Sequence, residues 1–174
     1  MKLHLFILIF SIGIYTSYAQ GIDISVGYSP NGVAANINYN HYLENSYVQI
    51  GLYGSYANTK YEEYKIPFSD ITMQIGYFLP VLENRKQTIQ FSVGAGVTAG
   101  YEIISKGGEF LSNGAKVKSM SSFIYGGFLS GELNFTISEN FFGLLKYNHY
   151  YHLNSDLGNL YSYAGLGIRY YIDK

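Results

Sequence analysis

The sequence predicts an all-β fold, and three features of the chain lead to this prediction. Apolar and polar residues alternate over eight separate segments, as they do in strands whose two faces meet different surroundings. Tyr, Phe and Gly are abundant, at 20, 11 and 20 of 174 residues, whereas only 13% of the residues are charged. Beyond the first 20 residues, no apolar run approaches the ~20 residues that a membrane-spanning helix needs.

The first 19 residues predict a signal peptide for Sec-dependent export. Lys2 precedes a short apolar run, and the small residues Ser17 and Ala19 that follow it predict cleavage after Ala19. A retained anchor is the alternative, but the run is too short for a spanning helix with ordinary flanks. We therefore expect residues 1–19 to be removed and residues 20–174 to form a single domain.

Eight strands explain the alternation. In FSVGAGVTAGYE, at residues 91–102, apolar residues alternate with Ser, Gly, Thr and Glu. The expected strands cover residues 21–29, 33–42, 47–57, 68–79, 88–103, 121–137, 141–151 and 160–172. In that order, their apolar rows include Ile22, Ile24 and Val26; Val33, Ile37 and Tyr39; Val48, Ile50 and Leu52; Ile71, Met73 and Ile75; Val93 and Val97; Phe123, Leu129 and Leu133; Phe141, Leu145 and Tyr147; and Leu166, Ile168 and Tyr170.

The connections between the strands alternate in length. PNG at 30–32 predicts a tight hairpin, with Asn31 and Gly32 in a type I′ turn and residue 30 paired with residue 33. Further connections on that side are expected at 58–67, 104–120 and 152–159, and those on the opposite side at 43–46, 80–87 and 138–140. An even number of strands, with short turns beside the termini and longer loops at the other end, is typical of bacterial outer-membrane barrels.

The polar face indicates which side of the barrel meets lipid. A soluble, lipocalin-like barrel with its apolar face inside is the alternative. The polar rows, however, carry only six charges among roughly fifty positions, whereas a soluble surface is about 25–35% charged. Tyr and Phe in the apolar rows suit the aromatic girdles of a membrane protein. The sequence therefore predicts an eight-stranded antiparallel outer-membrane β-barrel of a Gram-negative bacterium.

The charges on the inward face predict two ion pairs, because an unpaired buried charge is strongly unfavourable. A turn centred on 138–140 places Glu132 opposite Lys146. Asp23 and Arg169 lie near the same end of the first and last strands, which become neighbours when the barrel closes. Side chains fill the interior of a barrel of this size, so we expect structural ion pairs. A proton or ion relay is the alternative role of the four residues.

Composition and spacing exclude most other sites. The exported part has 10 Lys and Arg against 12 Asp and Glu, which gives no basic face for nucleic acid. The absence of cysteine excludes disulfides and thiolate chemistry. Gly94, Gly96 and Gly100 alternate within a strand with no helix after them, which favours close packing in a narrow lumen over phosphate binding. His41 lies far from the other histidines of the barrel. We expect no metal, cofactor or small-molecule substrate.

The strongest candidate for catalysis is HYYHLNSD, at residues 149–156, near the outer end of the seventh strand. It contains His149, His152, Ser155 and Asp156, and a serine hydrolase needs a base and a carboxylate aligned with its serine. Ser155 and Asp156 fall in a loop, however, and their spacing matches no acyl-hydrolase motif. His149 has the outward parity of an interfacial residue. We therefore expect no enzymatic activity.

Several segments of the second half occur together in a distinctive order. They are FSVGAGVTAGYE (91–102), GGEFLSNGA (107–115), FIYGG (123–127), Glu132 and GLGIRYYI (165–172). In order and spacing they resemble the TraO family of conjugative transposons in the Bacteroides group, over residues 88–172. The resemblance implies a component of the conjugative transfer apparatus at the cell envelope, with no assigned enzymatic activity. It carries over no functional residues.

These observations predict a non-enzymatic outer-membrane barrel within a mating apparatus. Its expected partners are outer-membrane lipid and other transfer proteins, which would contact the 104–120 loop or the inner turns. A loop that is simply solvated is the alternative for residues 104–120. A general small barrel for adhesion or envelope stability, and a lipid-modifying barrel enzyme, are the alternative functions.

Overall fold

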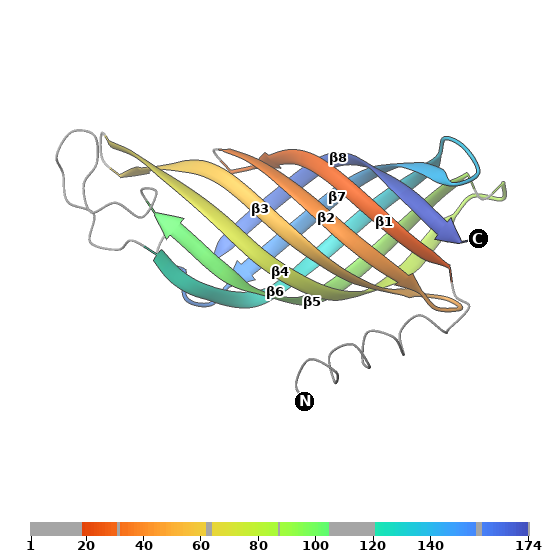
Figure 1. The fold of residues 1–174 in the computed structure, drawn as a ribbon, viewed down its shortest axis with the longest axis horizontal. Coiled ribbons are helices and arrows are strands. Elements are labelled where there is room, and N and C mark those ends of the chain that lie inside the picture. Colours follow the sequence, from red (N-terminus) through yellow and green to blue (C-terminus); the bar gives the residue numbers. More distant parts are fainter. Residues whose placement is uncertain are drawn as a thin grey trace, which may run out of the picture.

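Eight antiparallel strands form a closed barrel in the computed structural model of the protein (Figure 1). The structure describes residues 19–30, 32–61, 64–86, 88–104, 121–155 and 158–173. Each strand pairs with the next, and β8 pairs with β1 to close the sheet. The strands are β1 (Gln20–Ser29), β2 (Gly32–Tyr42), β3 (Tyr47–Tyr61), β4 (Tyr64–Glu83), β5 (Ile89–Ile104), β6 (Ser121–Thr136), β7 (Phe141–His152) and β8 (Leu160–Asp173). The predicted eight-stranded antiparallel barrel is confirmed.

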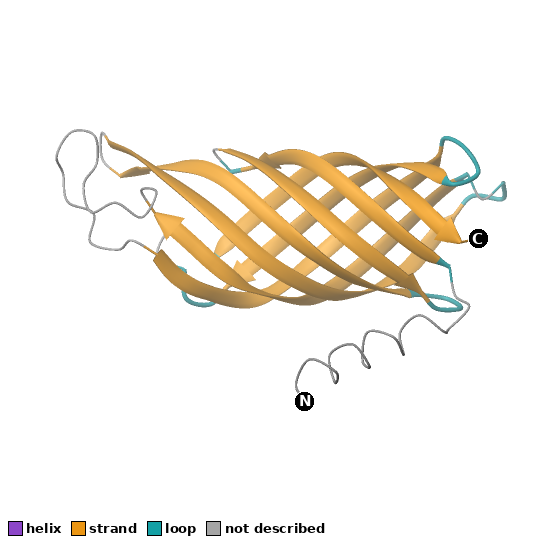
Figure 2. Cartoon of the chain, in the orientation of Figure 1, coloured by secondary structure: helices purple, strands orange, loops and turns teal. Residues whose placement is uncertain are grey.

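Figure 2 shows that the described part of the chain consists of strands and short connections. Its residues include no helix that is long and apolar enough to cross a membrane. The expected signal peptide before Ala19 and the 105–120 part of the long loop lie outside the described residues, as does Asp156. The start of β1 at Gln20 and the end of β8 at Asp173 lie at one end of the barrel, which we call the inner end, and the opposite end is the outer end (Figure 1).

The strands separate apolar and polar side chains as the alternation predicts. In β1, Ile24 is 47% exposed, whereas its neighbours Asp23 and Ser25 are buried in the lumen. Across the strand segments whose side chains are described, every Asp, Glu, Lys and Arg is buried except Glu83, which is exposed at the inner end. The apolar rows therefore form the outer wall of the barrel, and the charged residues of the strands lie inside it.

The expected outer loop at 58–67 is wrong, because β3 and β4 continue through most of it. The two strands stay paired from Asn58↔Pro67 to Tyr61↔Tyr64. β2 stops pairing with β3 at Ala57, and β5 begins pairing with β4 at Phe68. This hairpin therefore extends beyond the neighbouring strands (Figure 1). Apolar and polar residues alternate strictly only where a strand has the outside of the barrel on one face and the lumen on the other. The part of the hairpin beyond the neighbouring strands lacks these two environments, so its sequence does not show the alternation. Likewise, β4 continues to Glu83 past an irregularity between Pro80 and Leu82.

The first hairpin also differs from its predicted register. Ser29 pairs with Gly32, so the connection consists of residues 30–31, and Gly32 is the first residue of β2. The predicted pairing of residues 30 and 33 is wrong by two positions, a shift that keeps every side chain on its predicted face. A Cβ on Gly32 would overlap the backbone around Ala57, so close strand approach explains this glycine better than turn geometry does.

Aromatic rings fill the lumen next to glycines on neighbouring strands. The buried aromatic residues are Tyr47, Tyr53, Phe68, Phe78, Phe128, Tyr150, Tyr161 and Tyr163. A Cβ on Gly94 would overlap the Phe78 ring, and one on Gly96 would overlap Phe128 and the backbone of β4. The inward glycines thus provide the space that the rings occupy, as close packing in a narrow lumen requires.

We expect Gly94→Ala to destabilise the barrel by about 1–3 kcal/mol, because its methyl group overpacks the lumen against Phe78. Adding Phe78→Leu should restore part of the loss. Gly131→Ala is the matched control, since its Cβ would lie 3.6 Å from the Phe91 side chain, an ordinary contact. The free energy of unfolding in urea, measured in lipid vesicles, tests the prediction. Equal effects of the two alanines would contradict it.

Candidate functional site

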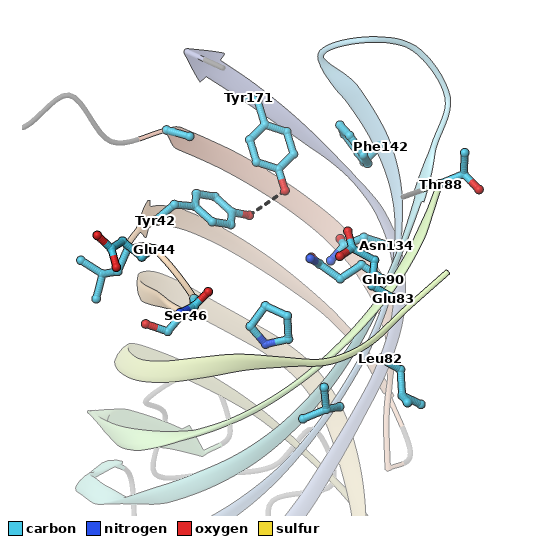
Figure 3. A pocket seen from close by; sticks show the side chains of 15 residues that line it. Tyr42, Glu44, Ser46, Leu82, Glu83, Thr88, Gln90, Asn134, Phe142 and Tyr171 are labelled. Carbon is cyan, nitrogen blue, oxygen red and sulfur yellow. Dashed lines mark hydrogen bonds between the residues drawn. The ribbon is translucent and has the colours of Figure 1, made fainter. Parts of the chain in front are cut away.

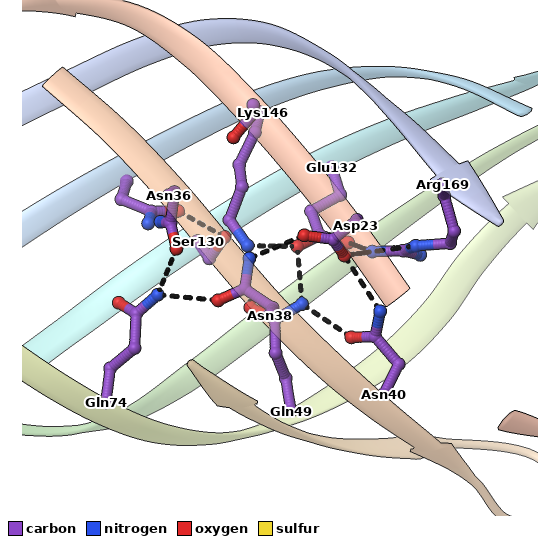
Figure 4. Close-up of polar contacts among 12 residues, drawn as sticks. Asp23, Asn36, Asn38, Asn40, Gln49, Gln74, Ser130, Glu132, Lys146 and Arg169 are labelled. Carbon is purple, nitrogen blue, oxygen red and sulfur yellow. Dashed lines mark hydrogen bonds and ion pairs between the residues drawn. The ribbon is translucent and has the colours of Figure 1, made fainter. Parts of the chain in front are cut away.

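Four buried charged residues form one connected group across the lumen (Figure 4). Arg169 Nη2 lies 2.6 Å from Asp23 Oδ2 and 2.6 Å from Glu132 Oε2, so one guanidinium joins two carboxylates. Lys146 Nζ lies 2.7 Å from Glu132 Oε1. The β-sheet register places Glu132 directly opposite Lys146, and Asp23 directly opposite Arg169. Sequence parity identified all four residues, but it did not reveal the Arg169–Glu132 contact that connects the pairs.

Side-chain amides of β2, the neighbour of β1, and of β3 complete the coordination of these charges. Asn38 and Asn40 of β2 donate to Asp23, over 2.5 and 2.8 Å. Gln49 of β3 donates to Glu132 Oε1 over 3.1 Å and accepts a 2.6 Å hydrogen bond from Lys146 Nζ. With its two cations and two anions paired and hydrogen-bonded, the group meets the condition under which charge is tolerated in a low-dielectric interior.

Neutral polar residues extend the network toward the outer end. Gln74 donates to Asn36 and Asn38, over 2.7 and 2.8 Å, and accepts a 3.0 Å hydrogen bond from the Tyr150 hydroxyl. Asn148 donates to the same hydroxyl over 2.6 Å. Hydrogen bonds therefore connect β2, β4 and β7 across the lumen. Figure 4 shows the bonds from Gln74 to Asn36 and Asn38, in the layer next to the charged group. This layer is filled by side chains.

Aromatic rings cover the charged group on its inner side. Arg169 Cζ lies 5.3 Å from the centroid of the Tyr47 ring, and Lys146 Nζ lies 5.7 Å from that of Phe78. The two rings stack on each other at 4.9 Å, and the Tyr47 hydroxyl donates to Glu132 Oε2 over 2.7 Å. The sequence analysis missed these inward rings. Their signal was parity, because Tyr47 and Phe78 share a face with Gln49 and Gln74 respectively.

A pocket of about 560 Å³ opens at the inner end of the barrel (Figure 3). The β2–β3 turn, the end of β4 and the start of β5 form much of it, and β6, β7 and β8 contribute Asn134, Phe142 and Tyr171. Tyr42 donates to the Tyr171 hydroxyl over 2.9 Å, and Phe142 packs edge-on against Tyr171 at 4.9 Å. Arg169 Nη1 donates to the Tyr42 hydroxyl over 3.2 Å, which links the pocket wall to the charged group.

The outer end of the lumen holds a second, separate polar group. Asp70 and Glu102 are buried neighbours on β4 and β5, and Ser55 donates to Asp70 over 3.1 Å. Ser155 donates to Glu102 Oε2 over 2.7 Å and lies 3.1 Å from the Tyr161 hydroxyl. These hydrogen bonds satisfy only part of the carboxylate pair, because Asp70 Oδ1 has no hydrogen-bond partner among the described residues. The sequence analysis singled out Ser155 but did not predict its contact with Glu102.

The histidines of the HYYHLNSD segment do not form a catalytic pair with Ser155. His152 is buried between Tyr150 and Tyr161, and neither ring nitrogen has a hydrogen-bond partner among the described residues. His149 lies on the outer wall, where its Nδ1 is 2.9 Å from Ser162 Oγ. Within the described part of the chain, no group of three or more His, Asp or Glu residues is placed to hold a metal ion.

The family model of the conjugative transposon protein TraO matches residues 12–172. The chain belongs to the TraO family. The match extends well before residue 88, so it includes the first four strands, in which the motifs quoted above do not occur. The family match therefore includes both halves of the barrel and the four residues of the charged group.

The fold of the TraO-family protein is similar to that of small bacterial outer-membrane barrels. The attachment invasion locus protein Ail of Yersinia pestis matches with a TM-score of 0.58 and 14% identity, over 90% of this chain and 100% of that chain. Neisserial surface protein A gives 0.55 and 10%, over 89% and 97%. The N-terminal barrel domain of Pseudomonas aeruginosa OprF gives 0.51 and 12%, over 89% and 98%. A comparison with the curated proteins gives no match.

Arg169→Met should destabilise the TraO-family barrel by about 3–5 kcal/mol, because it leaves two buried carboxylates with one cation. Adding Asp23→Asn should recover part of this loss, since Glu132 and Lys146 then remain as a neutral pair. Arg85→Met, in the exposed β4–β5 turn, is the control and should change stability by less than about 0.5 kcal/mol. Urea unfolding in vesicles measures all three. An Arg169→Met effect no larger than the control's would refute the structural role of the network.

Proposed function

We propose that the protein is a non-enzymatic outer-membrane component of a conjugative transfer apparatus. Family membership supports the link to conjugative transposons, and the outer wall supports the membrane placement. The observation that carries the proposal is the barrel wall, on which the described strands expose apolar side chains and keep charged ones inside. A wall of this kind is stable against lipid and unfavourable in water.

A barrel in the outer membrane also implies that a signal peptide is removed and that the barrel has a defined orientation in the membrane. Residues 1–19 act as a Sec signal peptide, and residues 20–174 form the transmembrane barrel in the outer membrane of a Gram-negative bacterium. The inner end, with both termini and the short turns, faces the periplasm, as in bacterial barrels of this size. Tyr and Phe side chains on the wall, such as Tyr101 and Phe123 near the outer end and Phe141 and Tyr170 near the inner end, then lie toward the membrane interfaces.

The filled lumen favours a structural role over transport. The charged group, the amide layer and the buried rings occupy the barrel interior, so the surfaces at the two ends are what the protein presents to partners. In this role it anchors other transfer proteins at the outer membrane and contributes no chemistry of its own. The paired lumen charges hold the barrel together and do not relay protons.

An arginine on the outer wall tests whether that wall meets lipid. Leu52→Arg, on β3 between Ile37 and Met73, should lower the free energy of unfolding in vesicles by about 2–4 kcal/mol. Leu52→Met keeps the side chain apolar and similar in volume, and it should cost less than about 1.5 kcal/mol. On a water-facing surface the arginine would be tolerated within about 0.5 kcal/mol, and that result would reverse the assigned orientation.

Mating experiments test the role in conjugation. Deleting the gene from the donor should reduce the transfer frequency, and expression of the full chain in trans should restore it. Transfer at the parental frequency after deletion would exclude this role. It would leave a general barrel for adhesion or envelope stability as the remaining function of the fold. Membrane fractionation of the same strains, with heat-modifiable gel mobility of the protein, tests its placement independently.

A further inference from the structure

The inner-end pocket contains a buried polar side chain without a partner. Asn134 of β6 lines the pocket and is 2% exposed, and neither atom of its amide has a hydrogen-bond partner among the described residues (Figure 3). Burying an amide without hydrogen bonds is unfavourable by about 1–3 kcal/mol. The other buried amides near it, such as Gln49 and Asn40, are bonded within the lumen network. Asn134 therefore offers one donor group and one acceptor to an occupant of the pocket.

The charged side chains that line the pocket are acidic. Glu44 and Glu83 are its charged lining residues, and both are exposed on opposite sides of the opening (Figure 3). Arg85 and Lys86 follow Glu83 in the chain, but they do not line the pocket. Cleavage after Ala19 would remove Ala19 from the pocket lining and add one amino group at Gln20, which the two lining carboxylates still outnumber. The pocket therefore favours a cationic occupant over an anionic one.

The walls of the pocket suit an extended peptide that carries this cation. Tyr42, Tyr171 and Phe142 form an aromatic side, against which the stem and the charge of a Lys or Arg side chain can pack. In an extended chain, the N–H and C=O of one residue point to the same side, which matches the donor and acceptor of the Asn134 amide. A volume of about 560 Å³ accommodates a side chain and a short stretch of backbone.

We propose that this inner-end pocket binds an extended peptide segment with a central Lys or Arg, supplied by a partner protein on the periplasmic side. The Asn134 amide pairs with the peptide backbone, and Glu44 and Glu83 attract the cationic side chain. That the partner is another transfer protein rests on the proposed function. The pocket chemistry itself does not depend on that assignment.

Peptide binding to the mature full chain in nanodiscs tests the proposal. The probes are blocked pentapeptide mixtures with random outer positions and a central Lys, norleucine or Glu. Backbone amide shifts of residues 42–46 and 81–83 report binding. We expect the Lys mixture to bind about five-fold more tightly than the norleucine mixture at low salt, with a smaller difference at high salt. Equal binding of the Glu mixture, or no shift with any mixture, would overturn the proposal.

Three variants separate the contribution of the two carboxylates to peptide binding from that of the Asn134 amide. Glu44→Gln with Glu83→Gln should bring the preference for Lys below about two-fold, whereas Glu139→Gln, an acid of the β6–β7 turn outside the pocket lining, should retain it. Asn134→Leu should weaken binding of the Lys and norleucine mixtures alike, by about five-fold, because it removes backbone hydrogen bonds. Unchanged heat-modifiable mobility shows that the variants fold. Phosphoethanolamine that binds as tightly as the Lys mixture would identify a lipid headgroup and contradict a peptide ligand.

Mating assays distinguish this inference from the proposed function. If deletion of the gene abolishes transfer and the variant with Asn134→Leu, Glu44→Gln and Glu83→Gln restores it fully, the pocket is not a docking site for a transfer protein. If deletion leaves transfer unchanged but the Lys mixture still binds, the role in conjugation fails and the peptide site stands.

Discussion

A closed barrel gives each strand residue only two environments, the lumen or the outside, and successive residues alternate between them. Every other feature of the structure depends on this constraint. It places Ile24 on the outer wall and its neighbours Asp23 and Ser25 inside. A one-residue slip in any strand would move its charges to the wall and its apolar row to the lumen. The register is therefore fixed by the contents of the lumen and by the medium around the wall together.

The lumen itself is stabilised by two kinds of packing that depend on each other. Arg169 joins Asp23 and Glu132, and the rings of Tyr47 and Phe78 cover the charged group on its inner side. The rings fit because inward glycines such as Gly94 leave room for them. Charges shielded from water in this way interact strongly, but only while each keeps its partner. The interior is therefore filled, and the surfaces at the two ends of the barrel are the ones available to bind partners.

Much of the fold, and the four charges of the lumen, could be predicted from the sequence because strand parity and turn position are local properties. The turn after β6 was enough to place Glu132 opposite Lys146. The predictions that were wrong, the loop at 58–67 and the register of the first turn, depended on information that strand parity does not contain. The hairpin beyond Asn58 has no barrel wall to impose alternation, and the first turn shifted by two residues without moving any side chain to the other face. The pocket around Asn134 joins residues from distant turns and leaves no motif.

The most direct test of the account measures what touches the outer wall. Because the chain has no native cysteine, single cysteines at Ile71, Met73, Ile75, Tyr77 and Leu79 can each carry a spin label in the reconstituted barrel. We expect collisions with dissolved oxygen to be greatest, and collisions with a water-soluble nickel chelate to be lowest, at the middle of this row. A label at Glu44 in the inner turn provides the water-exposed reference. Nickel accessibility equal to that reference along the whole row would contradict the account.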